Sequence, residues 1–150
     1  MIVGAPSIAK SVRIQVKIVM MVTADYAAVE PQTGKLNVIG VFNRITAKSF
    51  PLTYHRMYIA VRLEAEMEDG AEPHQLLITL ASEDGHEMLA IKGDFEMPKS
   101  SRGIFPQLEI VCEFNQLKFP AAGDYRIYVR VDDGELVDES CVLQVVQADD

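Results

Sequence analysis

The last quarter of the chain contains the pattern that most constrains the fold. Residues 125–132 alternate between inward and outward side chains, Asp133-Gly134 follows, and a second run up to residue 146 continues the inward row. A period of two puts one row of side chains in a core and the other in water, which is typical of a half-buried strand. Asp-Gly favours a tight turn because glycine adopts positive φ without steric cost. The sequence therefore predicts a closing β-hairpin whose inward row is Tyr125, Ile127, Val129, Val131, Cys141, Leu143 and Val145.

The same alternation recurs upstream and predicts an all-β protein. The expected strands lie at 12–20, 24–29, 36–45, 57–67, 76–80, 88–97 and 108–114, besides the closing hairpin. No segment has the 3.6-residue period of a helix. About eight strands joined by short turns favour a β-sandwich with Ig-like or Greek-key connections, and a small β-barrel is the alternative. Tyr125 follows a Gly-Asp turn, the place of the tyrosine found at sandwich corners.

The length of 150 residues suits one domain with one core. We expect an N-terminal tail or arm at 1–10, a sandwich domain at 11–147 and an acidic C-terminal end at 148–150. No apolar run approaches the length of about 20 residues that a membrane helix needs. The first residues contain no basic side chain before Lys10 and do not resemble a secretory signal. A cytoplasmic location is therefore expected.

Two motifs near the start of the chain carry a family resemblance. They are Ala24-Asp25-Tyr26 and the run Gly34-Lys35-Leu36 to Ile39-Gly40-Val41-Phe42. Together with the Gly-x-Tyr strand at Gly123–Tyr125 and the final hairpin, they resemble an uncharacterised bacterial domain family over about residues 20–146. The family has no assigned activity, so the resemblance implies one domain and no site.

The charge of the chain is large and uneven. The formal net charge is −8, which argues against nucleic acid or an anionic membrane as a partner. Residues 1–50 contain six Lys or Arg and two Asp or Glu, whereas residues 51–150 contain eight and twenty. Solvated strand faces account for this asymmetry, and the alternative is a dipolar molecule that meets copies of itself.

Catalytic, cofactor and metal motifs are absent from the sequence. The serines have no Gly-x-Ser-x-Gly context, and neither a phosphate loop nor a dinucleotide fingerprint occurs. We expect Cys112 and Cys141 to be free, inward-facing thiols without a redox role. No cofactor and no metal ligand set is predicted. An enzyme whose site is assembled from separate strands remains the weakest alternative.

Acidic loops offer a second alternative, a ligand-binding or calcium-binding module. One cluster is Glu64, Glu66, Glu68 and Asp69, and the other runs from Asp132 to Glu139. Neither matches the spacing of an EF-hand loop. The three histidines, His55, His74 and His86, are far apart and lack a neighbouring ligand at metal spacing.

The strongest functional prediction is protein–protein contact, either self-assembly or membership of a bacterial assembly. The stretch Val19–Val22 is apolar on both faces, which suggests that something covers it. Asp25 lies in an apolar run, and if it is buried it needs a partner, which Lys35 or Arg44 could supply. Gly40 inside a strand marks a bulge or a close backbone approach. The candidate interaction patch consists of Val19, Met21, Asp25, Tyr26, Asn43 and Arg44.

Overall fold

The computed structural model describes residues 16–66, 72–99 and 103–149. This part of the chain folds into nine β-strands and contains no helix, so no helix there could cross a membrane. The strands are β1 (Val16–Val29), β2 (Leu36–Phe42), β3 (Arg44–Ala47), β4 (Leu52–Ala65), β5 (Pro73–Ala81), β6 (Glu87–Glu96), β7 (Gln107–Phe119), β8 (Gly123–Val131) and β9 (Val137–Gln147). Residues 1–10, the predicted strand start at Val12 and the acidic pair Glu68 and Asp69 lie outside the described residues.

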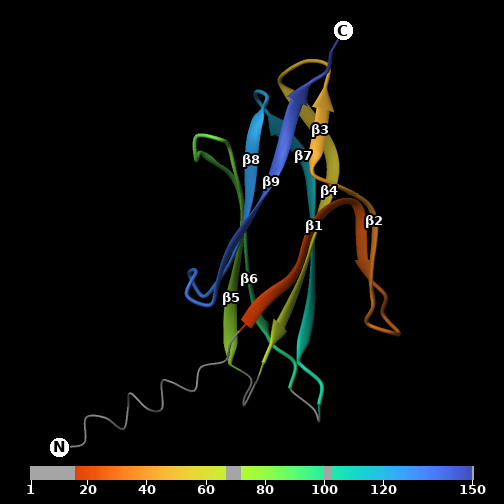
Figure 1. The fold of residues 1–150 in the computed structure, drawn as a ribbon, viewed down its shortest axis with the longest axis vertical. Coiled ribbons are helices and arrows are strands. Elements are labelled where there is room, and N and C mark those ends of the chain that lie inside the picture. The colour runs from red at the N-terminus through yellow and green to blue at the C-terminus, as the bar shows by residue number, and fades with distance from the viewer. Residues whose placement is uncertain (1–15, 67–71, 100–102, 150) are drawn as a thin grey trace, which may run out of the picture.

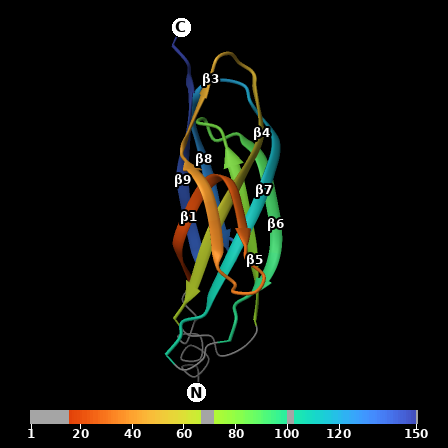
Figure 2. The same ribbon diagram turned by 90° about the vertical axis from the view of Figure 1, so that its right-hand side faces the viewer.

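Two separate sheets make up the fold. The four-stranded sheet has the order β2-β1-β4-β7, and the five-stranded sheet has the order β3-β9-β8-β5-β6. Figures 1 and 2 show the two sheets lying against each other along the long axis of the molecule. The predicted single-domain β-sandwich is confirmed, and the alternative barrel is not formed.

The first half of the chain differs from the predicted strand boundaries. The runs expected at 12–20 and 24–29 form one strand, β1, because neither glycine nor proline interrupts the chain between them. The run expected as one strand at 36–45 is divided at Asn43 into β2 and β3, which belong to different sheets. The Asn43 carbonyl accepts a hydrogen bond from the Gln144 amide at 2.9 Å, and β3 then pairs parallel with β9.

The alternating rows identified in the sequence fill the space between the sheets. In β4, Met57, Ile59, Val61, Leu63 and Ala65 are all fully buried. These side chains meet a second buried row from the five-stranded sheet: Ile78, Leu80, Ile127, Val129, Val131, Leu143 and Val145. Because both rows come from central strands, the dry core lies along the middle of the sandwich.

The predicted closing hairpin is present, and Asp133-Gly134 lies in a connection that is longer than a two-residue turn. Tyr125 pairs with Leu143 and Val131 with Val137, and residues 132–136 join the strands. Gly134 has φ of 88°, as the Asp-Gly signal requires. The Tyr125 hydroxyl donates a hydrogen bond to the Ala121 carbonyl at 2.6 Å, which is the contact expected of a corner tyrosine. This bond ties the start of β8 to the connection that precedes it.

Candidate functional site

An exposed apolar surface lies on the hairpin formed by β1 and β2. Thr23 pairs with the fully buried Ile59, so its side of β1 faces the core. Since side chains alternate along a strand, Ala24 and Tyr26 lie on the opposite side, where Ala24 is covered and Tyr26 is exposed. Tyr26 pairs with Ile39, and Ala24 pairs with Val41, which places both β2 residues on the same outward side.

We call Tyr26, Ile39 and Val41 the hairpin face. Their relative exposures are 46%, 62% and 61%, which is high for large apolar side chains in strands. The Tyr26 ring also meets the Tyr58 ring edge-on at 5.3 Å, so the surface continues onto β4. The pairing of β1 with β4 ends at Ala24 and Tyr58, and beyond that point β1 pairs only with β2. Figure 1 shows the hairpin tip reaching away from the two packed sheets.

The predicted patch is divided between two sides of the four-stranded sheet. Tyr26 lies on the hairpin face, and Val19 is exposed at the β-bulge between Ile18 and Met20. Met21 pairs with Val61 and is half-buried on the core side. The six predicted residues therefore do not form one surface.

Asn43 and Arg44 belong to the point where the chain changes sheets. The Arg44 Nε atom donates a hydrogen bond to the Gln144 side chain at 3.1 Å. With the bond from the Gln144 amide to the Asn43 carbonyl, this contact anchors the start of β3 to β9. Both side chains are exposed, but their bonds fix the strand crossing rather than extend the hairpin face.

Asp25 is exposed, so it does not need the buried ion pair that the sequence would require of a buried aspartate. Among the described residues, no ion pair joins it to Lys35 or Arg44. Its carboxylate instead lies over Gly40, where an added Cβ would come within 2.3 Å of Asp25 Oδ2. Gly40 has φ of 69°, and the β1–β2 register continues unchanged on both sides of it. The close backbone approach predicted for Gly40 is therefore confirmed, without a bulge.

The other neighbour of Asp25 is Tyr54 on β4. Burial, and to a smaller degree the negative charge of Asp25, raises the pKa of Tyr54. The Tyr54 ring packs against Phe42 with 5.9 Å between centroids. The core side of the hairpin is thus closed by an aromatic pair and a carboxylate, and the outward side is left apolar and open.

Replacing Gly40 with alanine should destabilise the fold through Asp25. Positive φ costs an alanine about 1–2 kcal/mol, and overpacking against the carboxylate adds about 1–3 kcal/mol. Gly34 is the matched control, because its φ is 70° and nothing lies within 4 Å of an added Cβ. Urea unfolding should show a larger loss for Gly40→Ala than for Gly34→Ala. Adding Asp25→Ala to Gly40→Ala should reduce the difference, although Asp25 Cβ still lies 3.1 Å from the added Cβ. Equal losses in the two single variants would contradict the Asp25 contact.

The acidic clusters do not converge in the part of the chain that the structure describes. Asp132 binds His74 and the Gln75 amide, and Asp138 pairs with Arg130 at 3.1 Å. Glu64 accepts from Gln107 at 2.9 Å. Within the described ranges, no group of three or more His, Cys, Asp or Glu is placed to hold a metal ion. Each of these three carboxylates is therefore bound by its own partner within the protein.

The two cysteines are free thiols, as predicted, and lie in different sheets. Burial raises the pKa of Cys112 on β7. Burial also raises the pKa of Cys141 on β9, where the nearby Arg126 charge acts in the opposite direction. A raised thiol pKa lowers the fraction of reactive thiolate. Both cysteines therefore act as small apolar side chains.

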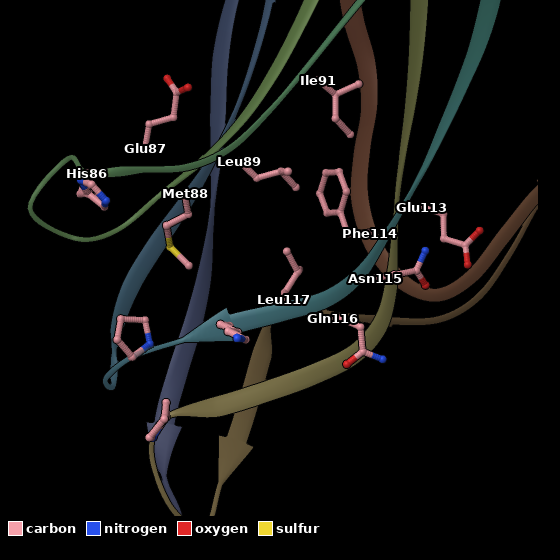
Figure 3. Close-up of a pocket in the computed structure, with 13 residues that line it drawn as sticks. His86, Glu87, Met88, Leu89, Ile91, Glu113, Phe114, Asn115, Gln116 and Leu117 are labelled. Atoms are coloured by element: carbon pink, nitrogen blue, oxygen red, sulfur yellow. The ribbon is translucent and has the colours of Figure 1, made fainter.

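A second surface feature is an open groove of about 690 Å³ between the edge strands β6 and β7. Figure 3 shows Met88, Leu89 and Ile91 from β6 facing Phe114 and Leu117 from β7. The polar side chains, among them Glu87, Glu113 and Gln116, stand at its rim. The groove is an apolar opening between the sheets with charged borders.

Sequence reasoning missed Ile39 and Val41, the most exposed members of the hairpin face. The available signal was that β2 is apolar on both faces, with Leu36, Val38 and Phe42 on one side and these two on the other.

The fold and this surface define an all-β sandwich that presents an apolar hairpin at one sheet edge. The chain belongs to the DUF6941 family, a family of unknown function, whose model matches residues 19–145.

Other comparisons give distant likenesses only. The chain matches none of the curated proteins. A β-glucosidase from Listeria innocua in complex with gluconolactone is similar with 8% identity and a TM-score of 0.49, over 89% of this chain and 16% of that one. The DNA glycosylase AlkC from Pseudomonas fluorescens, bound to DNA containing an abasic site analog, shares 15% identity with a TM-score of 0.46, over 89% and 31%. The chain therefore spans less than a third of the length of either structure.

Proposed function

We propose that this protein is a non-enzymatic interaction module of the bacterial cytoplasm that acts through protein–protein contact at the hairpin face. The observation that carries the proposal is the exposure of Tyr26, Ile39 and Val41 on one side of a hairpin that extends beyond β4. Exposed apolar side chains that gather on one surface mark contact sites, whereas single ones are ordinary. Tyrosine is also enriched at the centres of protein interfaces.

The surroundings of the hairpin face favour contact with protein. Its three side chains carry no charge, whereas ion pairs lie farther along the outer face of the sheet. Arg62 pairs with Glu109 at 2.7 Å, and Arg56 pairs with Glu113 at 3.1 Å. An apolar centre beside a polar rim is the usual anatomy of a protein interface. We also propose that the sandwich is Ig-like. Domains of that architecture commonly work by surface contact, which agrees with the proposed function.

Site-specific photo-crosslinking tests the contact function. A photoreactive phenylalanine analogue replaces Tyr26, and in the control it replaces Tyr128, which lies on β8 in the other sheet. We expect irradiation in the producing cells to give discrete protein adducts from position 26. Position 128 should give few, and Ile39→Lys should abolish the adducts from position 26. Equal crosslinking at both positions, or none at position 26, would contradict the proposal.

A further inference from the structure

The four sheet edges of the described structure differ in how they are protected. Natural proteins block edge strands with charge, proline, bulges or short length, because an open edge offers unpaired backbone groups to another strand. β3 has only four residues. β6 contains Glu87, Lys92, Asp94 and Glu96, and β7 contains Glu109, Glu113 and Lys118. β2, with the sequence Leu-Asn-Val-Ile-Gly-Val-Phe, has neither a charge nor a proline.

The free side of β2 is therefore ready for strand pairing. Within the described residues, β2 pairs only with β1. Figure 1 shows it at the margin of the four-stranded sheet, on the side where the hairpin projects. Ile39 and Val41 stand on the outer face beside this edge, so a strand that joined it would cover them in part. Backbone pairing and apolar burial would then act on the same partner.

Building on the contact function, we propose that the partner of β2 is the β2 strand of a second copy, paired antiparallel about a two-fold axis near Gly40. Such a pair keeps the outer faces of both copies on one side of a continuous eight-stranded sheet. Ile39 of one copy then lies opposite Val41 of the other on that face, and Val38 lies opposite Phe42 on the core side. The strand is thus complementary to itself on both faces.

Charge opposes a second copy less at this edge than elsewhere on the chain. With a net charge of −8, two copies repel each other wherever their acidic parts meet. Like charges directly opposite each other also destabilise a strand pair. Residues 36–42 contain no charge, and the described chain around them, residues 16–48, has four basic and two acidic side chains. Pairing through β2 brings the least acidic part of each copy together and keeps the acidic remainder apart.

Sedimentation equilibrium of the purified chain tests this inference. The wild type should fit a monomer–dimer equilibrium at micromolar to millimolar concentration. Ile39→Lys should raise the dissociation constant at least tenfold without changing the melting temperature. Ile104→Lys is the matched control, because Ile104 is 65% exposed but precedes β7, and it should leave the equilibrium unchanged. A wild-type monomer at every concentration, or equal effects of the two lysines, would overturn the inference.

Disulfide trapping tests the register. In a Cys112→Ala/Cys141→Ala background, an Ile39→Cys protein is mixed with a Val41→Cys protein and oxidised. Residues opposite each other in an antiparallel pair have Cα atoms about 4.5–5.5 Å apart, within the range of a disulfide. The mixed dimer should exceed both same-variant dimers, and a statistical mixture would overturn the proposed axis.

If the wild type is monomeric and Ile39→Lys still removes the crosslinks from position 26, this inference fails and the proposed function stands.

Discussion

Replacing Phe119 with alanine should lower the free energy of unfolding by about 3–5 kcal/mol, the range for a fully buried aromatic ring. Phe119 has no exposed surface, and its ring meets the Tyr125 ring edge-on at 4.9 Å. The loss combines the transfer of the ring, the cavity that remains and the lost ring contact. Tyr125 also donates to the Ala121 carbonyl, so the cavity would loosen the corner that this bond holds.

Phe105 provides the control for this prediction because it precedes a proline, as Phe119 does, but lies largely exposed. Phe105→Ala should change stability by less than about 0.5 kcal/mol, the usual range for surface substitutions. In calorimetry, Phe119→Ala should lower the melting temperature by about 6–20 °C, at about 2–4 °C per kcal/mol for a domain of this size. Similar shifts in the two variants would contradict the role assigned to Phe119.

The three Phe-Pro pairs show where sequence reasoning ends. The sequence gives the same interpretation to Phe50-Pro51, Phe105-Pro106 and Phe119-Pro120, that of apolar plugs at the ends of a sandwich. In the structure Phe119 is buried, Phe50 is half-buried with a cis bond to Pro51, and Phe105 is exposed. Whether a phenylalanine at a strand end is buried depends on which side chains of the opposite sheet lie against it. The Phe-Pro dipeptide alone carries no information about those side chains.

Strand positions could be predicted because alternation is local. The row from Met57 to Ala65 in β4 appears in the sequence as it does in the core. Connections between sheets are not local. Nothing in the run 36–45 shows that the chain leaves one sheet at Asn43, since the bonds that cause the crossing come from Gln144, about a hundred residues later.

The candidate site was predictable in part for the same reason. Gly40 was identified because a glycine inside a strand pattern has few explanations. The exposure of Asp25 could not be predicted, because its apolar neighbours in the sequence do not show whether another element covers it, and β1 extends past β4 there. Ile39 and Val41 were missed because exposure follows from strand order. Only the order β2-β1-β4-β7 shows that β2 is an edge.

Removing the carboxylate of Asp132 should be the other strongly destabilising change. Asp132 Oδ2 lies 2.8 Å from His74 Nδ1, and Asp132 Oδ1 accepts from the Gln75 amide at 2.9 Å. His74 is only 5% exposed and packs against Phe95 at 5.4 Å, and its Nε2 atom is buried without a hydrogen-bond partner. In Asp132→Ala both ring nitrogens and the Gln75 amide would lack a protein partner. A buried polar group such as the His74 ring nitrogen costs about 1–3 kcal/mol when left unsatisfied, whereas the exposed Gln75 amide can bind water instead.

Asp133 separates this effect from backbone strain. Asp132 and Asp133 have φ of 52° and 56°, so alanine at either position has the same conformational cost. Urea unfolding should therefore show Asp132→Ala to be less stable than Asp133→Ala by about 1–3 kcal/mol, chiefly because the buried His74 ring loses its partner. Asp132→Asn should fall between them, because asparagine tolerates positive φ and keeps one acceptor oxygen. If Asp132→Ala and Asp133→Ala lose equal stability, the carboxylate does not hold β5 to the closing hairpin and backbone conformation alone accounts for the loss.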